Sequence, residues 1–208
     1  QPFHWLAEFY QIIHDNGGFD VIIGNPPYVE YSKVRKKYII SNYRCLDSGN
    51  LYAYVIERTL NISHIGSRNG MIIQMSAFCT PRMKSFQKVW FANASFASLA
   101  FFDDRPGKLF DNLQHIRVVI PILQKGVANH SVNTTCYNKF YSEYRQYLFQ
   151  TLNYYESTIS VMDFSVIKIH TEIEESIVKN IWKMKRKIGS YESENVNSNF
   201  VYYGHGYG

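Results

Sequence analysis

Apolar and polar positions along the chain predict helices and strands in turn. Between residues 3 and 14 the apolar side chains recur at helical spacing, and Gly17 and Gly18 mark the end of that helix. The segment 19–24, FDVIIG, is a continuous apolar run, which is typical of a parallel strand covered on both faces. The basic stretch 33–40 is predicted to be helical.

The alternation continues to residue 126. The further predicted elements are a helix at 50–65, a strand at 70–75, a helix at 82–93, and strands at 96–102 and 116–123. A polar loop at 103–115 joins the last two strands and has no helical pattern, so these strands are expected to be antiparallel neighbours. The pattern as a whole predicts the α/β class, with a mostly parallel sheet and helices on both sides.

The chain changes character after Gly126. Residues 127–165 are polar and tyrosine-rich and give no clear assignment, but Thr171 and Glu174 form a capping box that predicts a further helix, ending at Gly189. Basic residues in its last turn match the helix dipole, and a phosphate contact is the alternative. We therefore divide the chain into a unit at 1–126 and a C-terminal extension at 127–208.

Composition narrows the possible functions. The 208 residues carry a net charge of +5, with a pI near 9.0, which fits a polyanionic partner, and 17 Tyr and 14 Phe supply faces that can stack on bases. Three cysteines without CxxC spacing indicate reduced thiols, and neither they nor the scattered histidines predict a metal site. No apolar run is long enough for a membrane span, and no signal peptide is evident, so a cytoplasmic protein is expected. The pattern at both ends suggests a fragment of a longer polypeptide.

The most informative segment is Asn25-Pro26-Pro27-Tyr28, directly after the predicted strand at 19–24. Open α/β sheets bind ligands at the carboxyl ends of their strands. Two consecutive prolines make a rigid turn without backbone N–H groups, which leaves the Asn25 side-chain oxygen and the Pro26 carbonyl as acceptors. Together these two oxygens can accept hydrogen bonds from the two N–H groups of an amino group such as that of adenine. The nitrogen is then drawn toward tetrahedral geometry, and its lone pair becomes available to an electrophilic methyl group.

Tyr28 adds an aromatic ring beside these acceptors. A base inside a duplex must be flipped out before an enzyme can reach it, and stacking on an aromatic face offsets ~1–3 kcal/mol of the cost. The alternative interpretation is a tight turn after a strand. A turn alone does not require this combination of asparagine, two prolines and an aromatic residue.

Four ordered segments carry a resemblance to a known family: FDVIIGNPPYVEY, GNLYAYVIERTL, GMIIQMSAF and FFDDRPGKLFDNLQHIRVVIPILQKG. Together they resemble the gamma-class adenine-specific DNA methyltransferases, and among these the restriction-modification enzymes of the Eco57I and TaqI type (type II or IIG). The resemblance is strong over 1–126 and weaker beyond. It implies a Rossmann-like methyltransferase sheet with an antiparallel closing strand, S-adenosylmethionine as cofactor and double-stranded DNA as substrate.

The resemblance also implies roles for single residues. Asn25, Pro26, Pro27 and Tyr28 match the catalytic motif, in which Asn25 and Pro26 hold the amino group and Tyr28 stacks on the base. Phe110 packs on the base from another side; a hydrophobic plug in its loop is the alternative for Phe110. Asn25 and Val55 contact the cofactor, the latter from the helix beginning at Leu51, where ordinary core packing is equally compatible. Asn50 before that helix fits a helix cap as well as a site residue.

One departure concerns the cofactor. In this family a glycine-rich loop and an acidic residue that bind S-adenosylmethionine precede the Asn-Pro-Pro-Tyr strand, and this chain has neither. We expect the main cofactor loop to lie in an upstream part of the same polypeptide, so the chain alone binds the cofactor poorly and is inactive.

Basic residues near both motifs are candidates for contacts with DNA phosphates. They are Lys33, Arg35, Lys36 and Lys37 after the first motif, and Arg105 and Lys108 in the loop with Phe110. A solvated helix face is the alternative for the first group. Two other functions stay open: a glutamine-side-chain methyltransferase, which uses the same acceptors, and a non-catalytic DNA-recognition module that keeps the fold without turnover.

Overall fold

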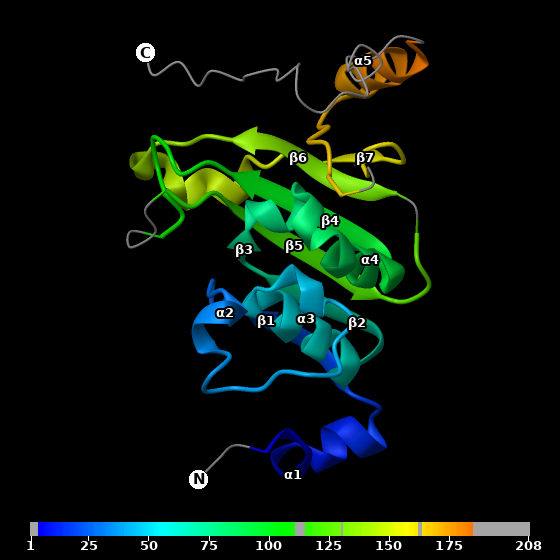
Figure 1. Cartoon of the computed structure of the whole chain (residues 1–208). Coiled ribbons are helices and arrows are strands. Elements are labelled where there is room, and N and C mark those ends of the chain that lie inside the picture. Colours follow the sequence, from blue (N-terminus) through cyan, green and yellow to red (C-terminus); the bar gives the residue numbers. More distant parts are fainter. Residues whose placement is uncertain (1–3, 111–114, 130, 162–163, 185–208) are drawn as a thin grey trace, which may run out of the picture.

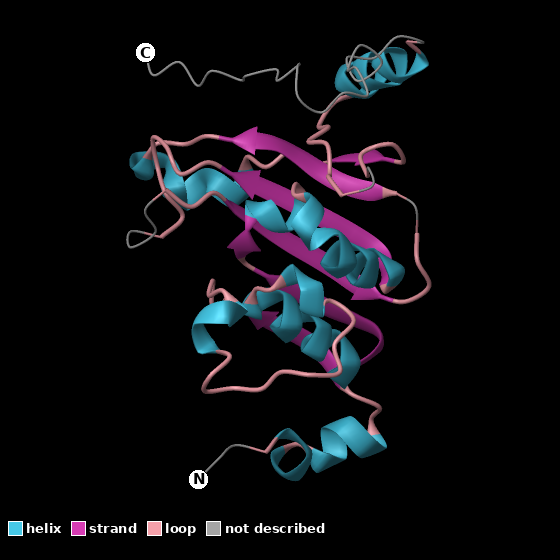
Figure 2. Cartoon of the chain, in the orientation of Figure 1, coloured by secondary structure: helices cyan, strands magenta, loops and turns pink. Residues whose placement is uncertain are grey.

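A computed structural model describes residues 4–110, 115–129, 131–161 and 164–184. Its centre is a seven-stranded sheet in the order β1-β2-β5-β4-β6-β7, with the short β3 paired to β5 (Figure 1). Helices and strands alternate along the first half of the chain, as Figure 2 shows. The α/β class predicted from the sequence is therefore confirmed.

The N-terminal elements follow the predicted order closely. They are α1 (Trp5–Glu8), a π-helical turn η1 (Gln11–Asp15), β1 (Phe19–Gly24), α2 (Tyr31–Val34), η2 (Leu46–Ser48), α3 (Leu51–Ile62), β2 (Ser63–Met71) and β3 (Ile73–Gln74). Asn50 caps α3, because its side-chain oxygen accepts the Tyr52 backbone N–H at 3.4 Å. The cap interpretation of Asn50 is confirmed.

The later elements extend the sheet past residue 126. They are η3 (Met75–Phe78), η4 (Pro81–Met83), α4 (Lys84–Ala92), β4 (Ala94–Phe102), β5 (Val118–Lys125), β6 (Val132–Asn138), the 3-10 helix η5 (Ser142–Gln150), β7 (Tyr155–Ser157) and α5 (Glu172–Lys183). Strands β6 and β7 come from the segment that the sequence left unassigned, and β6 pairs with β4 in the same sheet.

Strand direction brings several loops to one edge of the sheet. β1 pairs with β2 and β4 pairs with β6 in parallel, whereas β5 is antiparallel to its neighbours β2, β3 and β4. The predicted antiparallel pair of β4 and β5 is confirmed. "Mostly parallel" is not exact, however, because β5 lies inside the sheet and makes both of its long pairings antiparallel. The carboxyl ends of β1, β3, β4 and β6 consequently share one edge.

The core lies between the sheet and the helices α3 and α4, which Figure 1 shows on the same face. Trp90 and Phe86 of α4 meet Phe78 edge to face, with ring centroids 5.1 Å and 5.6 Å apart. A second, smaller cluster lies at the carboxyl end of β4; its buried members are Ala100, Phe102, Val118, Phe140 and Leu148. This cluster lies under the candidate site.

Two expectations from the sequence are wrong. β1 is not covered on both faces, since Val21 is 61% and Ile23 is 81% exposed; β1 is the edge strand of the sheet, with β2 alone beside it. The stretch 33–40 is helical only at its start, because α2 ends at Val34 and a turn follows. Arg35, Lys36 and Lys37 there are exposed, and the stretch has no apolar stripe that could pack a longer helix against the core.

The helix predicted after Thr171 is present as α5. The Thr171 hydroxyl accepts the Glu174 N–H at 3.2 Å, as an N-cap does, and the Glu174 carboxylate accepts the His170 N–H at 2.8 Å. α5 ends at Lys183, and the predicted end at Gly189 lies outside the described residues. None of the helices that the structure describes combines the length and apolar character needed to span a bilayer.

Candidate active site at the carboxyl edge of the sheet

Residues 25–30, here called the Asn25 loop, leave the end of β1 as an irregular segment. Asn25 and Pro27 are exposed, and Pro26 between them is buried. The loop starts from a fixed point, because the Gly24 carbonyl accepts the Ile72 N–H at 3.1 Å. Asn25 therefore presents its side chain at the surface from a proline turn that the sheet holds in place.

Tyr28 anchors the other end of this turn. Its hydroxyl donates to the Ile72 carbonyl at 2.9 Å, and its ring meets Tyr52 of α3 edge to face, with centroids 6.3 Å apart. Burial raises the pKa of Tyr28 to about 12, so the hydroxyl stays protonated and keeps donating at neutral pH. The ring is half-buried, with one edge against the core.

The loop then forms a short ladder with the cap of α3. Glu30 and Asn50 make an isolated antiparallel bridge, in which the Leu51 N–H donates to the Val29 carbonyl at 2.9 Å. The Glu30 carboxylate accepts from Asn50 Nδ2 at 3.3 Å and pairs with the Arg82 guanidinium. The hydrogen bond from Arg82 lowers the pKa of Glu30, so the pair is intact at neutral pH. The roles of Glu30 and Arg82 had no signal in the sequence, because they are 52 residues apart.

The second loop, here called the Phe110 loop, comprises the described residues 103–110 after β4 and 115–117 before β5. Asp103 and Asp104 at its start are each 7% exposed. The Asp103 N–H donates to the Asn138 carbonyl at 2.9 Å, and its carboxylate lies 3.4 Å from Arg117 Nε and 3.8 Å from Lys139 Nζ. Burial acts to raise the pKa of Asp103, but Tyr137, the Asp104 N–H and Arg117 together outweigh it, and the pKa is lowered. The base of the loop is thus an ionised carboxylate between two cations.

The segment 138–150 braces this loop from the side. Arg145 of η5 donates to the Lys108 carbonyl at 2.6 Å. Gly107 runs so close to the next segment that a methyl group there would lie 2.5 Å from the Phe140 carbonyl oxygen. Leu109 packs on the second cluster with Phe140 and Leu148. Phe110, the next residue, is half-buried.

The two loops meet at one core cluster. Tyr28 from the Asn25 loop and Leu109 from the Phe110 loop both pack against the cluster of Phe102, Phe140 and Leu148. The structure thus brings the two sequence-predicted motifs to one edge of the sheet, although they are about 80 residues apart in the chain.

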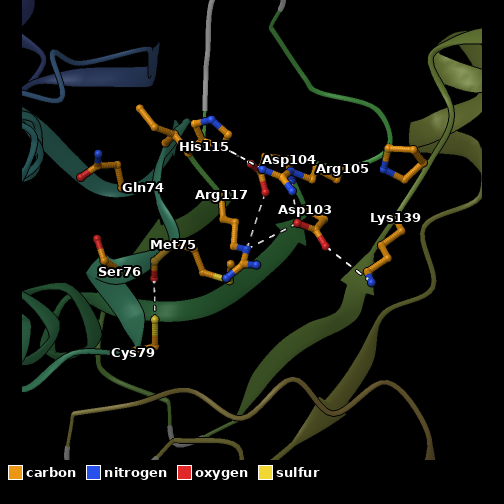
Figure 3. Close-up of a pocket in the computed structure, with 12 residues that line it drawn as sticks. Gln74, Met75, Ser76, Cys79, Asp103, Asp104, Arg105, His115, Arg117 and Lys139 are labelled. Carbon is orange, nitrogen blue, oxygen red and sulfur yellow. Dashed lines mark hydrogen bonds and ion pairs between the residues drawn. The ribbon is translucent and has the colours of Figure 1, made fainter. Parts of the chain in front are cut away.

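A charged cavity of about 1110 Å³ lies at the base of the Phe110 loop, as Figure 3 shows. Arg117 points at both aspartates and Lys139 at Asp103, while Gln74 and Ser76 form the opposite wall. Arg105 at its rim contacts His115 at 3.1 Å. Its ionised groups pair mainly with one another. The ion pairs of Asp103 and Asp104 with Arg117 hold the two ends of the Phe110 loop together.

A second, apolar cavity of about 780 Å³ lies along β1 and α3. Ile22, Pro27 and Ile40 line it from one side. From the other side it is lined by one face of α3: Leu51, Tyr54, Val55, Arg58, Thr59 and Ile62. Val55 is 37% exposed and faces this hollow, so it does not belong to the closed core. The cavity has no carboxylate in its lining.

The predicted DNA-binding residues lie at the surface on both loops. Lys33, Arg35, Lys36 and Lys37 are exposed in and after α2 (Tyr31–Val34), which directly follows the Asn25 loop. Arg105 is exposed and Lys108 partly exposed in the Phe110 loop. Among the described residues there is no group of three or more histidine, cysteine, aspartate or glutamate side chains that could hold a metal ion.

The chain is similar to proteins of restriction-modification systems. A family model described as Eco57I restriction-modification methylase matches residues 1–110. A putative type II restriction enzyme and methyltransferase of Methanocaldococcus jannaschii is 30% identical over 114 residues, which are 54% of this chain and 10% of that protein.

Two solved structures share the fold. One is a nuclease-deletion mutant of the Type ISP restriction-modification enzyme LlaGI in complex with a DNA substrate mimic, with a TM-score of 0.55 and 16% sequence identity. The match covers 82% of this chain and 20% of the LlaGI chain. The ATP-dependent Type ISP restriction-modification enzyme LlaBIII bound to DNA has a TM-score of 0.51 at 15% identity, with 74% and 13% covered. The chain therefore spans a small part of the length of the proteins that it matches.

Proposed function

The chain belongs to the Eco57I restriction-modification methylase family, and from this premise we propose that it is the catalytic-motif part of an adenine-specific DNA methyltransferase. In this proposal the full-length protein uses S-adenosylmethionine to methylate the exocyclic amino group of an adenine flipped out of double-stranded DNA. The observation that carries the proposal is the exposed Asn25 on a proline turn at the carboxyl end of β1, with Tyr28 fixed beside it.

Asn25 and Pro26 activate the amino group because their oxygens accept hydrogen bonds from its two N–H groups. Asn25 is an exposed residue, and the two prolines contribute carbonyls without competing N–H donors. An amino nitrogen held in this way becomes pyramidal, so its lone pair can attack, and no strong general base is required. The bound cofactor supplies an electrophilic methyl group on a sulfonium sulfur. The nitrogen loses a proton once it carries the methyl group.

Two aromatic residues support the flipped base in this proposal. Tyr28 is held by its hydroxyl bond to Ile72 and presents part of its ring beside Asn25. Phe110 comes from the opposite loop, braced by Arg145 through Lys108. Stacking on such rings offsets part of the energy that unpairing costs. The lysines and arginines in and after α2, together with Arg105 and Lys108 of the Phe110 loop, contact the flanking phosphates.

The described residues fit the cofactor only in part. Pro27, Leu51 and Val55 line an apolar cavity beside the Asn25 loop, which suits the less polar side of an adenosyl group. That cavity has no carboxylate for a ribose hydroxyl pair. This supports one wall of a cofactor pocket, with Val55 in it, and a requirement for further residues of the same polypeptide.

The test is Asn25→Ala in the full-length protein. We expect methyl transfer to fall by on the order of 100-fold or more, because one of two aligned acceptors is lost. Affinity for duplex DNA should stay within a few fold, since phosphate contacts dominate binding. Single-turnover transfer of labelled methyl groups measures the first quantity and fluorescence anisotropy the second.

Asn61→Ala, at an exposed asparagine of α3, is the matched control and should leave both unchanged. Mass spectrometry of the digested product identifies the modified base. Retained turnover in Asn25→Ala, an equal loss of DNA binding, or methyl groups found on protein glutamine would each refute the proposal.

A further inference from the structure

A row of exposed tyrosines follows one side of η5 (Ser142–Gln150). Tyr141 directly precedes this 3-10 helix, and Tyr144 and Tyr147 follow at steps of three residues. These three side chains are 62%, 59% and 50% exposed. In a 3-10 helix residues i and i+3 lie above one another, so Tyr144 and Tyr147 share one side, about 6 Å apart along the axis. We call Tyr141, Tyr144 and Tyr147 the tyrosine row.

The other sides of η5 explain its position. Arg145 and Leu148 form the inward row; Leu148 is 5% exposed, and Arg145 donates to the Lys108 carbonyl. Glu143, Gln146 and Phe149 form the third row, in which Phe149 meets Phe102 edge to face at 6.4 Å. Only the tyrosine row combines aromatic rings with hydroxyl groups at the surface. Packing of η5 does not require it.

The neighbourhood of the tyrosine row is basic. Its helix is bonded to the loop that carries Arg105 and Lys108, and Lys139 lies just before Tyr141, with a 65% exposed side chain. Glu143 is the acidic residue of η5 and lies in a different row. Tyrosine hydroxyls donate to phosphate oxygens, and lysines and arginines beside them supply the matching charge. This combination suits a polyanion.

We propose that the tyrosine row, continued by Lys108 and Arg105, contacts the sugar–phosphate backbone of the duplex next to the base held between the Asn25 and Phe110 loops. The proposal rests on the proposed function and deepens it, because it extends the DNA surface onto a segment outside the matched family region at 1–110. η5 then has two tasks: it braces the Phe110 loop through Arg145, and it binds the flanking strand through its tyrosines.

Salt dependence separates the two kinds of contact. A lysine bound to a phosphate displaces a counterion, so its removal lowers the slope of log affinity against log salt by about one. A tyrosine is neutral; its removal weakens binding at every salt concentration and leaves that slope unchanged. Loss of affinity with an unchanged slope is therefore the expected signature of the tyrosine row, and a reduced slope that of Lys108→Ala.

The experiment uses the full-length protein and a labelled duplex that contains its methylated site, as mapped by sequencing of modified DNA. The double variant Tyr144→Ala/Tyr147→Ala loses both hydroxyl hydrogen bonds and also the contacts of both rings, so it should bind about tenfold more weakly. Tyr144→Phe/Tyr147→Phe keeps the rings and should lose about threefold to fivefold. If the alanine variant does not fold, the phenylalanine variant still decides the question.

Two controls bracket the effect. Gln146→Ala changes an exposed residue of the neighbouring row, and Tyr10→Ala removes a 54% exposed tyrosine near the N-terminal helix. Both should bind DNA as the wild type does. Affinities of the tyrosine variants within twofold of wild type would overturn the inference, as would an equal loss in Gln146→Ala. A change in sedimentation without a change in DNA affinity would also overturn it and would indicate a protein contact.

The same measurements separate this inference from the proposed function. If the wild type methylates adenine and the tyrosine variants bind normally, the tyrosine row is not a DNA contact and the proposed function stands. If the tyrosine variants lose DNA affinity but the wild type methylates no adenine, the surface binds DNA and the proposed function fails.

Discussion

The Asn25 loop and the Phe110 loop pack on the same core cluster but are held in different ways. The hydrogen bonds and the one exposed ion pair that fix the Asn25 loop come from residues up to position 82, and the ring of Tyr28 also packs on the cluster that contains Phe140 and Leu148. The Phe110 loop starts from a buried carboxylate pair and depends on η5 (Ser142–Gln150) for its brace. The hydrogen bonds and the ion pair of the Asn25 loop thus come from the first 82 residues, whereas the Phe110 loop takes a hydrogen bond from the segment beyond residue 126.

The variant with the largest expected effect is Gly107→Ala, which tests whether the contact with Phe140 positions the Phe110 loop. The new methyl group would lie 2.5 Å from the Phe140 carbonyl oxygen, so the Phe110 loop must move away from its brace. A displacement of about 1 Å at a reacting site can cost on the order of 100-fold in rate. We expect a loss of that size in single-turnover methylation by the full-length protein, together with a lower melting temperature.

Gly70→Ala in β2 is the matched control for Gly107→Ala. A methyl group at Gly70 would meet Ile122 at 3.6 Å, an ordinary van der Waals distance. Its rate should stay within a few fold of wild type. If Gly107→Ala behaves in the same way, the close approach to Phe140 does not position the loop.

A smaller effect is expected from removal of one arginine on each side. Arg145→Met deletes the donor to the Lys108 carbonyl and should lower the signal of 2-aminopurine placed at the target by about threefold, because the Phe110 loop is less well ordered. Arg82→Met deletes the partner of Glu30, but Tyr28 and the bridge at Asn50 still hold the Asn25 loop. Its 2-aminopurine signal should be near that of wild type. Equal effects of the two variants would abolish the proposed difference between the loops.

The same contrast explains what the sequence could predict. The strand 19–24 and the helix α3 (Leu51–Ile62) with its Asn50 cap are local patterns, and the structure confirms both elements. The face of α3 that contains Val55 was also identified, although it lines a cavity and not the closed core. Local periodicity and turn chemistry decide such features.

The remainder depends on contacts between distant residues. The prediction that β1 is buried on both faces was wrong. An apolar pattern does not show which elements cover a strand, and β1 forms the edge of the sheet. The links from Arg82 to Glu30 and from Arg145 to Lys108 join residues 52 and 37 positions apart. A single sequence has no periodic signal for such pairs, so the brace of the Phe110 loop was not predicted.

The smallest expected effect is a pH dependence at the base of the Phe110 loop. The pKa of Asp103 is lowered in the folded protein, where its carboxylate lies near Arg117 and Lys139. A carboxyl group with a lowered folded pKa contributes stability that is fully present above its unfolded pKa of about 3.9, and that is lost as the pH falls through the folded value. Asp103→Asn should therefore lower the melting temperature at neutral pH by a few degrees, and its difference from wild type should shrink in acid.

Glu30→Gln is the matched variant on the Asn25 loop. The hydrogen bond from Arg82 also lowers the pKa of Glu30, so the sign of its pH dependence is the same. Its side chain is 37% exposed against 8% for Asp103, and solvent screens the pair with Arg82 more strongly. Thermal melts of both variants between neutral pH and about pH 3, where carboxyl groups titrate, should thus give a larger convergence with wild type for Asp103→Asn. A larger convergence for Glu30→Gln would mean that the Asn25 loop, and not the Phe110 loop, depends on its carboxylate.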